Sequence, residues 1–382
     1  MTSELSSLCS YAKGKVSVDT LSKRNYVSTE NMVPNKGGIV DAGALPSAQY
    51  TQQYMKDDIL VSNIRPYFKK IWMADDDGGC SNDVLVFRAE CGCDSTFLYY
   101  VLANDAFFNY ASATSKGTKM PRGDKTAIMQ YEVPCFNHET QLRIGKLLRS
   151  IDDRITVNKK INDNLEQQAQ SYFQELFVDN ADPEWAIGTI SDLGTVVGGS
   201  TPSKAKPEYY TESGIAWITP KDLSINKSKF VSHGENDITE LGLKNSSAAI
   251  MPEGTVLFSS RAPIGYIAIA AGEVTTNQGF KSVVPKPGIG TPFVYFFLKN
   301  TLPVIEGMAS GSTFKEVSGS TMKNVPAVIP DAETLAKFSD FCAPIFAQQR
   351  ILEEQNQSLA TLRDNLLPKL MSGEIDVSDV QL

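Results

Sequence analysis

The chain contains two copies of one sequence pattern, and this duplication limits the folds that are open to it. An aromatic run, Phe-x-Tyr-aromatic-x-Leu, occurs at 97–102 and again at 293–298. A Glu-Thr pair that opens a long helical pattern occurs at Glu139 and again at Glu333. A repeat of roughly half the chain is too long for a solenoid and predicts two similar domains related by a pseudo-two-fold axis. Such a protein is expected to bind a ligand that itself has two halves.

Each copy ends in a long helical pattern, the first from Glu139 to about Asn180 and the second from about Asp331 onward. Apolar residues recur at heptad spacing in both, and the first pattern has no Gly or Pro after Gly145. Such a run, present twice, favours pairing of the two helices over a helix that packs only on its own domain. Asn158 lies on the stripe, where a buried amide often fixes the helix register. The predicted pairing residues are Ile144, Leu147, Ile151, Asn158, Leu165, Phe338, Phe341, Ile345, Leu352 and Leu359.

Two prolines interrupt the second helical pattern. A proline inside a helix removes a hydrogen bond and clashes with the preceding turn. Pro344 is therefore expected either to kink the helix or to mark its true first turn, and Pro368 is expected to act in the same way near the end. At 1.5 Å per residue, an uninterrupted helix of roughly 30 to 40 residues would span about 45–60 Å.

The segments before the two helical patterns have a different pattern of residues. Short β-rich runs, such as 59–63 and 84–88, alternate with Gly and Pro, and an apolar helical stretch follows near 97–110. This mixture predicts compact α+β domains. The expected organisation is a globular domain at 1–138, a long helix at 139–180, a second globular domain at 181–330 and a second long helix at 331–382.

Composition excludes several classes of protein. With 42% hydrophobic and 21% charged residues the chain has ordinary globular usage, and no apolar stretch is long enough to span a membrane. The N-terminus lacks the basic start and apolar run of a signal peptide, so a cytoplasmic location is expected. Among the six cysteines only Cys91 and Cys93 form a close pair, and the two histidines are His138 and His233. Buried free thiols are therefore favoured over a metal site.

The net charge of −8 argues against a protein that binds polyanions over its whole surface, because Lys and Arg supply most of the non-specific affinity for nucleic acid. Any DNA contact must therefore use local basic clusters or positive charge from a partner. The clusters in the sequence are Arg65, Lys69 and Lys70; Lys116, Lys119, Arg122 and Lys125; and Lys204, Lys206 and Lys221.

The sequence lacks the common catalytic motifs. It has no Gly-x-x-x-x-Gly-Lys-Ser/Thr phosphate loop, no Pro-Pro of the amino-methyltransferase motif and no Asp/Glu-x-Lys of many nuclease sites. Ser312-Thr-Phe-Lys315 fits the Ser-x-x-Lys pattern of acyl-transfer serine enzymes, but two other segments fit this short pattern equally well. We therefore expect no catalytic residue and no metal site, and keep a hydrolase that uses Ser312 and Lys315 as a minor alternative.

Polar, glycine-punctuated loops separate the apolar strands of the second globular segment. Arg261 suits a guanine edge or a phosphate, and Asn277 and Gln278 suit an adenine edge. Serine hydroxyls and lysines suit phosphates, and Phe314 could stack or act as a wedge. The alternative role of each residue is to form a turn or to hydrogen-bond a strand end. The candidate DNA-binding residues in this half are Ser200, Thr201, Ser203, Lys204, Lys221, Ser259, Ser260, Arg261, Asn277, Gln278, Lys281, Ser312, Phe314 and Lys315.

Taken together, these segments resemble the specificity (S) subunit of type I restriction-modification systems. Ser-Thr-Pro-Ser, Trp-Ile-Thr-Pro-Lys-Asp, Ser-Ser-Arg-Ala-Pro-Ile-Gly, Thr-Asn-Gln-Gly-Phe and Ser-Gly-Ser-Thr-Phe-Lys follow in the family's order. Residues 161–177 and 365–375 are similar to the family's central helix and C-terminal helix end. Residues 26–39 resemble another type of target-recognition domain in the same family, so the resemblance covers nearly the whole chain.

The resemblance implies an α+β fold in which two target-recognition domains are separated by two long antiparallel coiled-coil helices. It implies a subunit without catalytic activity that reads a bipartite, asymmetric target in double-stranded DNA. The implied partners are two methyltransferase (M) subunits, docked on the helices, and two restriction (R) subunits. Those partners would bind S-adenosylmethionine, ATP and Mg, so this chain would need no cofactor, and each M subunit would extrude one adenine.

The two halves of the sequence differ most in their loops. The aligned loops are 62–66 with 259–263, 81–83 with 276–278, and 117–119 with 311–313. A shared scaffold with different reading loops implies two different half-sites. The candidate DNA-binding residues in the first half are Asn63, Arg65, Lys69, Lys70, Asn82, Lys116, Lys119 and Arg122.

The main alternative is a stand-alone tandem-domain binding protein for a carbohydrate or a peptide. Such a protein would need no partner subunit and should be monodisperse by itself. An S subunit that exposes apolar helix faces should instead self-associate or aggregate when it is alone.

Overall fold

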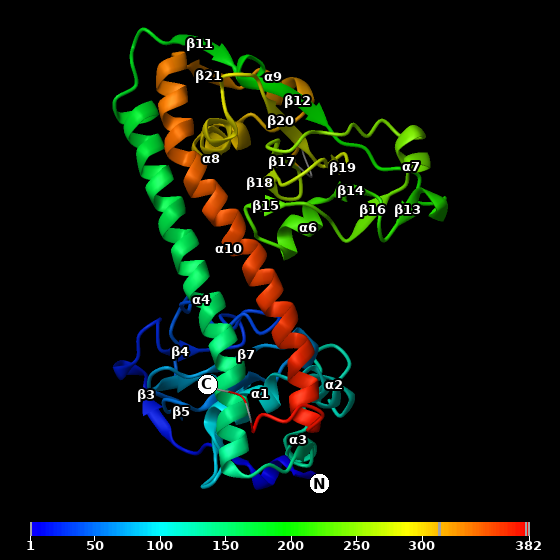
Figure 1. The fold of residues 1–382 in the computed structure, drawn as a ribbon. Helices are drawn as coiled ribbons and strands as arrows, with labels where there is room; N and C mark the ends of the chain where they lie inside the picture. Colours follow the sequence, from blue (N-terminus) through cyan, green and yellow to red (C-terminus); the bar gives the residue numbers. More distant parts are fainter. Residues whose placement is uncertain (1, 312–314, 379, 381–382) are drawn as a thin grey trace. The chain divides into compact units, whose positions relative to one another are not determined.

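The computed structural model describes residues 2–311, 315–378 and 380. The chain divides into two compact units, unit 1 with Met1–Thr156 and Gln357–Leu382, and unit 2 with Val157–Asn356. Each unit mixes strands with helices, which confirms the predicted α+β class (Figure 1). Unit 1 is therefore built from both ends of the chain, and unit 2 from its middle.

Two four-stranded sheets make up most of the strand structure of unit 1. Its strands are β1 (Thr2–Glu4), β2 (Cys9–Tyr11), β3 (Lys15–Ser17), β4 (Tyr26–Val27), β5 (Tyr50–Tyr54), β6 (Ile59–Ser62), β7 (Ile71–Met73), β8 (Gly78–Cys80), β9 (Val84–Ala89) and β10 (Glu132–Pro134). The first sheet is antiparallel with the order β2-β9-β6-β7, and the second has the order β3-β5-β8-β4 with a parallel β4/β8 pair. A separate antiparallel pair joins β1 to β10.

The apolar helical stretch predicted near 97–110 is two helices, α1 (Ser95–Ala103) and α2 (Asp105–Ala113). The break falls at Asn104, whose backbone is extended and whose side chain accepts a hydrogen bond from the Ala106 N–H at 3.0 Å. Asparagine favours this N-cap position because its side-chain oxygen satisfies a backbone donor that the first helical turn leaves free. One short helix, α3 (Lys125–Met129), follows.

Unit 2 repeats the first sheet of unit 1 with one more strand. Its strands are β11 (Ala186–Thr189), β12 (Gly194–Gly198), β13 (Tyr210–Thr211), β14 (Ile215–Ile218), β15 (Phe230–Val231), β16 (Asn236–Ile238), β17 (Val256–Ser260), β18 (Ile264–Ala270), β19 (Thr275–Thr276), β20 (Lys281–Pro285) and β21 (Pro326–Ile329). The order β12-β20-β17-β18-β15 matches β2-β9-β6-β7 and adds β15, and β11/β21 matches β1/β10. The second sheet, β13-β16-β14-β19, differs from its counterpart in strand order.

The helices of unit 2 lie between these strands along the chain. They are α5 (Ile190–Leu193), α6 (Pro220–Ile225), α7 (Glu240–Lys244), α8 (Thr291–Gly307) and α9 (Gly319–Lys323). Helix α8 carries the second copy of the aromatic run, and α1 carries the first. The repeated run therefore occupies a helix of each unit.

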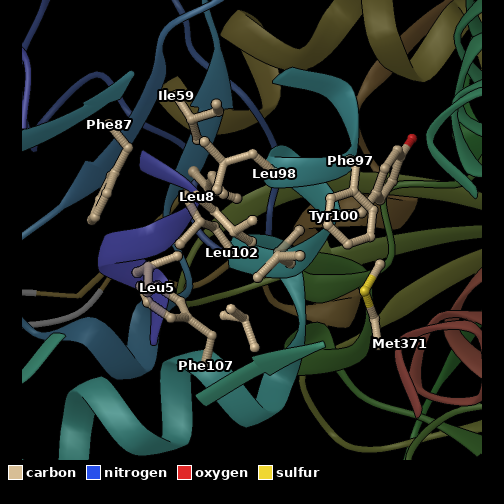
Figure 2. Close-up of a cluster of buried hydrophobic side chains, with 14 of the residues drawn as sticks. Leu5, Leu8, Ile59, Phe87, Phe97, Leu98, Tyr100, Leu102, Phe107 and Met371 are labelled. Atoms are coloured by element: carbon tan, nitrogen blue, oxygen red, sulfur yellow. The ribbon is translucent and has the colours of Figure 1, made fainter. Parts of the chain in front are cut away.

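The main core of unit 1 is completed by parts of the two long helices, α4 (His138–Gln174) and α10 (Ala332–Ser372). Ile144 near the start of α4 and Leu370 near the end of α10 join Phe97 and Leu98 of α1 in one buried cluster. Figure 2 shows Phe97 and Leu98 in this cluster, with Met371 of α10. Each fully buried side chain of this size contributes about 1.5–3 kcal/mol, so the two helices are part of the domain core.

Unit 2 uses the opposite parts of the same helices. Phe173 near the end of α4 has its ring centroid 5.9 Å from Phe296 of α8 and 5.9 Å from Phe338 near the start of α10. Ile345 of α10 lies in the same buried cluster. The apolar stripe predicted for helix pairing is thus shared between the partner helix and the globular part of each unit.

The segments of α4 and α10 run antiparallel inside each unit. In unit 2, the Asn158 Nδ2 donates to Asn356 Oδ1 at 3.0 Å, and the rings of Tyr172 and Phe341 are 4.5 Å apart. In unit 1, Arg363 Nη1 donates to Asp152 Oδ1 at 2.7 Å. Among the other predicted pairing residues, Ile151 and Leu352 are buried, whereas Leu147, Leu165 and Leu359 are half-buried.

The second long helix begins where the sequence pattern predicts, near Asp331, so of the two expectations for Pro344 the one that it marks the first turn is wrong. Helix α10 begins at Ala332 and continues past both Pro344 and Pro368 to Ser372. The neighbours Cys342, Ile345 and Phe346 are buried in the core of unit 2. Their burial offsets the helix-interior cost of proline, which is about 3 kcal/mol.

Candidate nucleic-acid interface

Arg261, Lys281 and Glu316 form one ionic cluster in unit 2, at the end of β17. Arg261 Nη1 lies 3.5 Å from Glu316 Oε2, and Lys281 Nζ lies 3.8 Å from Glu316 Oε1. Burial lowers the pKa of Lys281, while the Glu316 carboxylate acts in the opposite direction. Lys315 directly precedes Glu316 in the chain and is exposed. The cluster places two cations, Arg261 and Lys281, beside one carboxylate, so a phosphate could replace the carboxylate as their partner.

Ser259 and Ser260 hold this loop in place. Both are fully buried. Ser259 Oγ donates to the Pro263 carbonyl at 2.9 Å and accepts from the Tyr266 N–H at 2.7 Å, and Ser260 Oγ donates to the Gly279 carbonyl at 3.1 Å. Their hydroxyls are therefore not accessible to a phosphate in this structure, and strand-end hydrogen bonding is the role that the geometry supports.

A second pair of loops meets at Gln278. Asn277 Oδ1 accepts from the Gly279 N–H at 2.8 Å, and the side-chain Oε1 of the exposed Gln278 accepts from Thr201 Oγ1. The Ser200 N–H donates to the Thr276 carbonyl at 2.8 Å. Residue 199 must be glycine here, because a Cβ at this position would lie 1.9 Å from the Asn277 carbonyl oxygen.

The remaining predicted residues of unit 2 lie at the surface. Ser203 and Lys204 are exposed, and Lys221 is exposed but paired with Glu235 at 2.5 Å. Ser312 and Phe314 lie outside the residues that the structure describes.

In unit 1 the predicted residues come from three loops that touch. Backbone bridges join Ile64 to Arg122 and Lys116 to Arg122, and the Asn63 N–H donates to the Asp83 carbonyl at 2.8 Å. Asn63 itself is buried, whereas Asn82, Lys116 and Lys119 are exposed. The loops that begin at Asn63, at Asn82 and at Lys116 therefore form one continuous surface.

Several cations of this surface are paired with carboxylates. Lys69 contacts Asp105 at 2.8 Å, Lys116 contacts Asp124 at 2.5 Å and Arg122 contacts Asp83 at 2.9 Å. The Lys70 Nζ donates to the Thr29 carbonyl at 2.5 Å. The side chains of Lys116 and Arg122 are more than half exposed, and ion pairs of exposed cations are weak, so DNA phosphates can compete with these carboxylates.

Sequence reasoning missed a basic pocket beside Asn82, with a volume of about 560 Å³. Lys13, Lys15 and Lys125 line it together with Tyr50. These residues lie far apart in the sequence. The pairing of β2 with β9, the pairing of β3 with β5 and the hydrogen bond from the Tyr11 hydroxyl to the Lys125 carbonyl bring them to one site. The cluster of Lys116 to Lys125 was visible in the sequence, but Lys13 and Lys15 carried no signal of their own.

The two units build these loops on one framework. In unit 2, the backbone of Glu316 forms antiparallel β-bridges with Arg261 and with Ser310. In unit 1, the backbone of Arg122 forms the corresponding β-bridges with Ile64 and with Lys116. The charge at this shared position is therefore reversed between the two units.

The sequence alignment of one loop was wrong by one residue. The Ser81 N–H donates to the Val27 carbonyl in unit 1, as the Asn277 N–H donates to the Ile218 carbonyl in unit 2. Ser81 therefore corresponds to Asn277, and Asn82 corresponds to Gln278. The strand pairs β4/β8 and β14/β19 set this register, which similarity of residue types did not reveal.

Within the described part of the chain, no group of three or more His, Cys, Asp or Glu side chains is arranged to hold a metal ion. Over the same residues, no helix has the length and apolarity needed to cross a membrane.

Comparison with known proteins identifies the family of this fold. The family model described as "Type I restriction modification DNA specificity domain" matches residues 1–167 and 183–362. The specificity subunit of the type I restriction enzyme MjaIX from Methanocaldococcus jannaschii is 39% identical over 194 residues, which are 48% of this chain and 45% of that protein. The HindI specificity subunit from Haemophilus influenzae is 23% identical over an alignment of 434 positions, covering 92% of this chain and 94% of that protein.

A solved structure shares the fold. The type I restriction-modification S subunit from M. genitalium aligns over 97% of this chain and 96% of its own length, with a TM-score of 0.60 and 18% sequence identity. The match spans both globular units and both long helices, which supports the predicted fold class.

Proposed function

This chain belongs to the type I restriction-modification DNA specificity family, and we propose that it reads a bipartite, asymmetric DNA target, one half-site with each unit. The observation that carries the proposal is the reversed charge on a shared framework. Arg122 of unit 1 and Glu316 of unit 2 take the same bridging position between two loops. Two units that share the framework of the first sheet and differ in loop charge are suited to two different half-sites.

The proposed contacts combine phosphate binding with base reading. The cations at the ends of the loops, such as Lys119, Lys204 and Lys315, are exposed and suit phosphates. The guanidinium group of Arg261 can form two hydrogen bonds with a guanine edge in the major groove, and the amide of Gln278 can do so with an adenine edge. The basic pocket of unit 1 adds Lys13, Lys15 and Lys125 to the phosphate contacts.

We further propose that two methyltransferase and two restriction subunits assemble with this chain. In this proposal the partners bind S-adenosylmethionine, ATP and Mg, and this chain has no catalytic role. The methyltransferases would dock on α4 and α10, and these two helices would set the length of the non-specific spacer. Support comes from the 37 and 41 residues of the two helices and from the acidity of the chain, which fits a subunit whose partners supply positive charge.

Co-expression with the type I methyltransferase subunit of the source organism tests the proposal. The chain should form a complex of one S subunit with two methyltransferase subunits, and sequencing of methylated adenines should show a target in two parts with a fixed spacer. A chain that stays alone in this mixture, as a tandem carbohydrate or peptide binder would, contradicts the proposal.

A further inference from the structure

Two neighbouring aromatic side chains of unit 1, Tyr67 and Phe68, are exposed to solvent by 52% and 38%. Their ring centroids are 4.8 Å apart. They lie on a short 3-10 turn, η3 (Pro66–Phe68), between β6 and β7. Exposed pairs of large aromatic side chains usually mark a binding surface, because burial of their rings is worth several kcal/mol. We call Tyr67 and Phe68 the aromatic tip.

The backbone holds the aromatic tip in a fixed conformation. Arg65 and Lys69, on either side of the tip, both have φ of 51°, in the left-handed region that residues with a side chain seldom adopt. Each such residue costs about 1–3 kcal/mol and persists only where its surroundings fix it.

Backbone hydrogen bonds supply these surroundings. The Arg65 N–H donates to the Pro121 carbonyl at 2.8 Å, and the Asn35 N–H donates to the Phe68 carbonyl at 2.9 Å. The Lys36 N–H donates to the Lys69 carbonyl at 2.8 Å. The tip is thus positioned before any ligand arrives, which lowers the entropy cost of binding.

The surroundings of the tip are cationic. The loop of the tip, 63–70, and the adjoining loop 116–123 contain six Lys or Arg residues and no Asp or Glu. Three of these cations, Lys69, Lys116 and Arg122, pair with carboxylates of neighbouring segments, which DNA phosphates would have to replace. Arg65 has no hydrogen bond or ion pair from its side chain to any described residue. Met120, 49% exposed, adds apolar surface next to Pro121. An apolar tip inside a rim of positive charge fits a polyanion that has flat apolar faces, which is the chemistry of stacked bases between phosphates.

Unit 2 has no such tip in the same place. Eight residues, 63–70, connect β6 to β7, whereas the three residues 261–263 connect β17 to β18. The chain of unit 2 enters β18 at Ile264 and Gly265, which follow Pro263 as Tyr67 and Phe68 follow Pro66. The aromatic tip therefore distinguishes the first unit from the second.

We propose that Tyr67 and Phe68 form a wedge that inserts between base pairs of the half-site read by unit 1 and partly unstacks them. The inference rests on the proposed function, because it takes DNA as the ligand. It predicts that this half-site is selected partly by how easily one base step opens, as in other proteins that insert apolar side chains into DNA.

The test uses the complete complex with its methyltransferase subunits and a duplex that carries the target. The fluorescent base analogue aminopurine is placed at successive steps of each half-site, away from the adenine that is methylated. Wild-type complex should raise the fluorescence at one step of the first half-site, and removal of the tip should leave every signal of the second half-site unchanged. Tyr67→Ala combined with Phe68→Ala should abolish this rise and weaken binding of the target by about tenfold or more.

Control variants separate a wedge from a change in fold. Tyr67→Phe keeps the ring and should keep the signal. Ile187→Ala removes an 86% exposed apolar side chain from unit 2 and should change neither signal nor affinity. Both substituted tip residues are exposed, so the far-ultraviolet circular dichroism of the double variant should match that of the wild type.

Three outcomes would overturn or limit the inference in different ways. Unchanged affinity and fluorescence in the double variant overturn the wedge, while methylation of a bipartite target by the wild type still upholds the proposed function. A double variant that no longer assembles with the methyltransferase shows that the tip contacts protein, which also overturns the wedge. A wild-type complex without a bipartite target removes the proposed function itself.

Discussion

Units 1 and 2 share a framework and differ in the polar groups that fix the long helices to each domain. In unit 1, Asp152 of α4 accepts from the Tyr100 hydroxyl at 2.7 Å and from Arg363 of α10. In unit 2, Glu166 of α4 accepts from Lys229 at 2.7 Å and from Lys299 at 2.5 Å. One unit thus uses a single cation from the partner helix, and the other uses two cations from its globular part.

The cluster of unit 2 is more deeply buried. The Lys229 side chain is 7% exposed, and its Nζ lies 3.5 Å from the centroid of the Phe346 ring. Gln349 Oε1 accepts from the same Nζ at 2.9 Å. A charge in such surroundings is stable only while its counter-charge remains. Two units with a similar fold thus use different ionic contacts to hold the same pair of helices, and the buried Lys229 makes unit 2 dependent on the carboxylate of Glu166.

Glu166→Ala should have the largest effect. It leaves Lys229 buried without a carboxylate, which should lower the free energy of unfolding of unit 2 by roughly 3–5 kcal/mol. Urea unfolding followed by tryptophan fluorescence in a Trp72→Phe background measures it, because the remaining Trp185 and Trp217 are in unit 2. In the same background, Lys229→Met should cost much less, since Glu166 keeps Lys299 at 2.5 Å and the Tyr295 hydroxyl at 3.1 Å as partners. Equal losses for both variants would show that packing, and not the buried charge, is responsible.

Acidification should also separate the two units. Burial by itself would raise the pKa of Glu166, but the attraction of Lys229 and Lys299 outweighs it and lowers the pKa to about 2. A carboxylate with a depressed folded-state pKa contributes stability above its unfolded pKa, near 4.5, and loses it as the pH falls toward 2. The free energy of unfolding of unit 2 should therefore decline between about pH 4.5 and 2. Glu166→Gln should flatten this part of the pH profile, and a profile of unchanged slope would contradict the assignment.

The reversed charge at the shared bridging position gives the third test. Arg122→Ala should weaken DNA binding by about tenfold and reduce the salt dependence of the affinity by about one unit of slope, because one phosphate contact is lost. Glu316→Gln should instead strengthen non-specific binding, since it frees Arg261 and Lys281. Electrophoretic mobility shifts of the assembled complex at several salt concentrations measure both. Changes of the same sign in the two variants would show that the position does not distinguish the units.

The smallest effect is expected at the buried amides of the helix pair in unit 2. Asn158 is fully buried, and its Oδ1 has no hydrogen-bond partner among the described residues. Replacing both Asn158 and Asn356 by Leu should raise the free energy of unfolding by ~1 kcal/mol, because no unsatisfied polar group is left. Chemical unfolding of the double variant checks this prediction. A loss of stability would mean that the amides fit the helix interface better than leucines do.

The sequence predicted the elements that depend on periodicity. The heptad stripe and the absence of Gly and Pro after Gly145 predicted the first long helix, which begins at His138. The repeat predicted two α+β units. Local helix propensity was misleading at two residues. At Pro344, burial of the neighbouring side chains keeps α10 helical, and at Asn104 a side-chain cap divides one apolar stretch into two helices. At Pro344 a local rule competed with tertiary packing, whereas at Asn104 two local preferences competed, the apolar helical pattern and the N-cap.

The loops were predicted less well, because residue type does not decide exposure. Ser259, Ser260 and Asn63 have the chemistry of DNA-contacting residues, yet the structure buries them. Lys13 and Lys15 were overlooked, because only strand pairing brings them beside Asn82. Whether a loop residue is exposed depends on the residues packed around it, and in a loop these come from distant segments of the chain.

By itself, the sequence determined that the fold is duplicated, that two long helices accompany two α+β domains, and which family the chain resembles. These properties follow from patterns that repeat along the sequence, so they can be recognised without a structure. Only the tertiary structure decided that each long helix contributes to both domain cores, that Arg122 and Glu316 take the same place, and that Tyr67 and Phe68 are exposed. Hydrogen-bond register and burial arise from contacts between segments far apart in the chain, which no local pattern encodes.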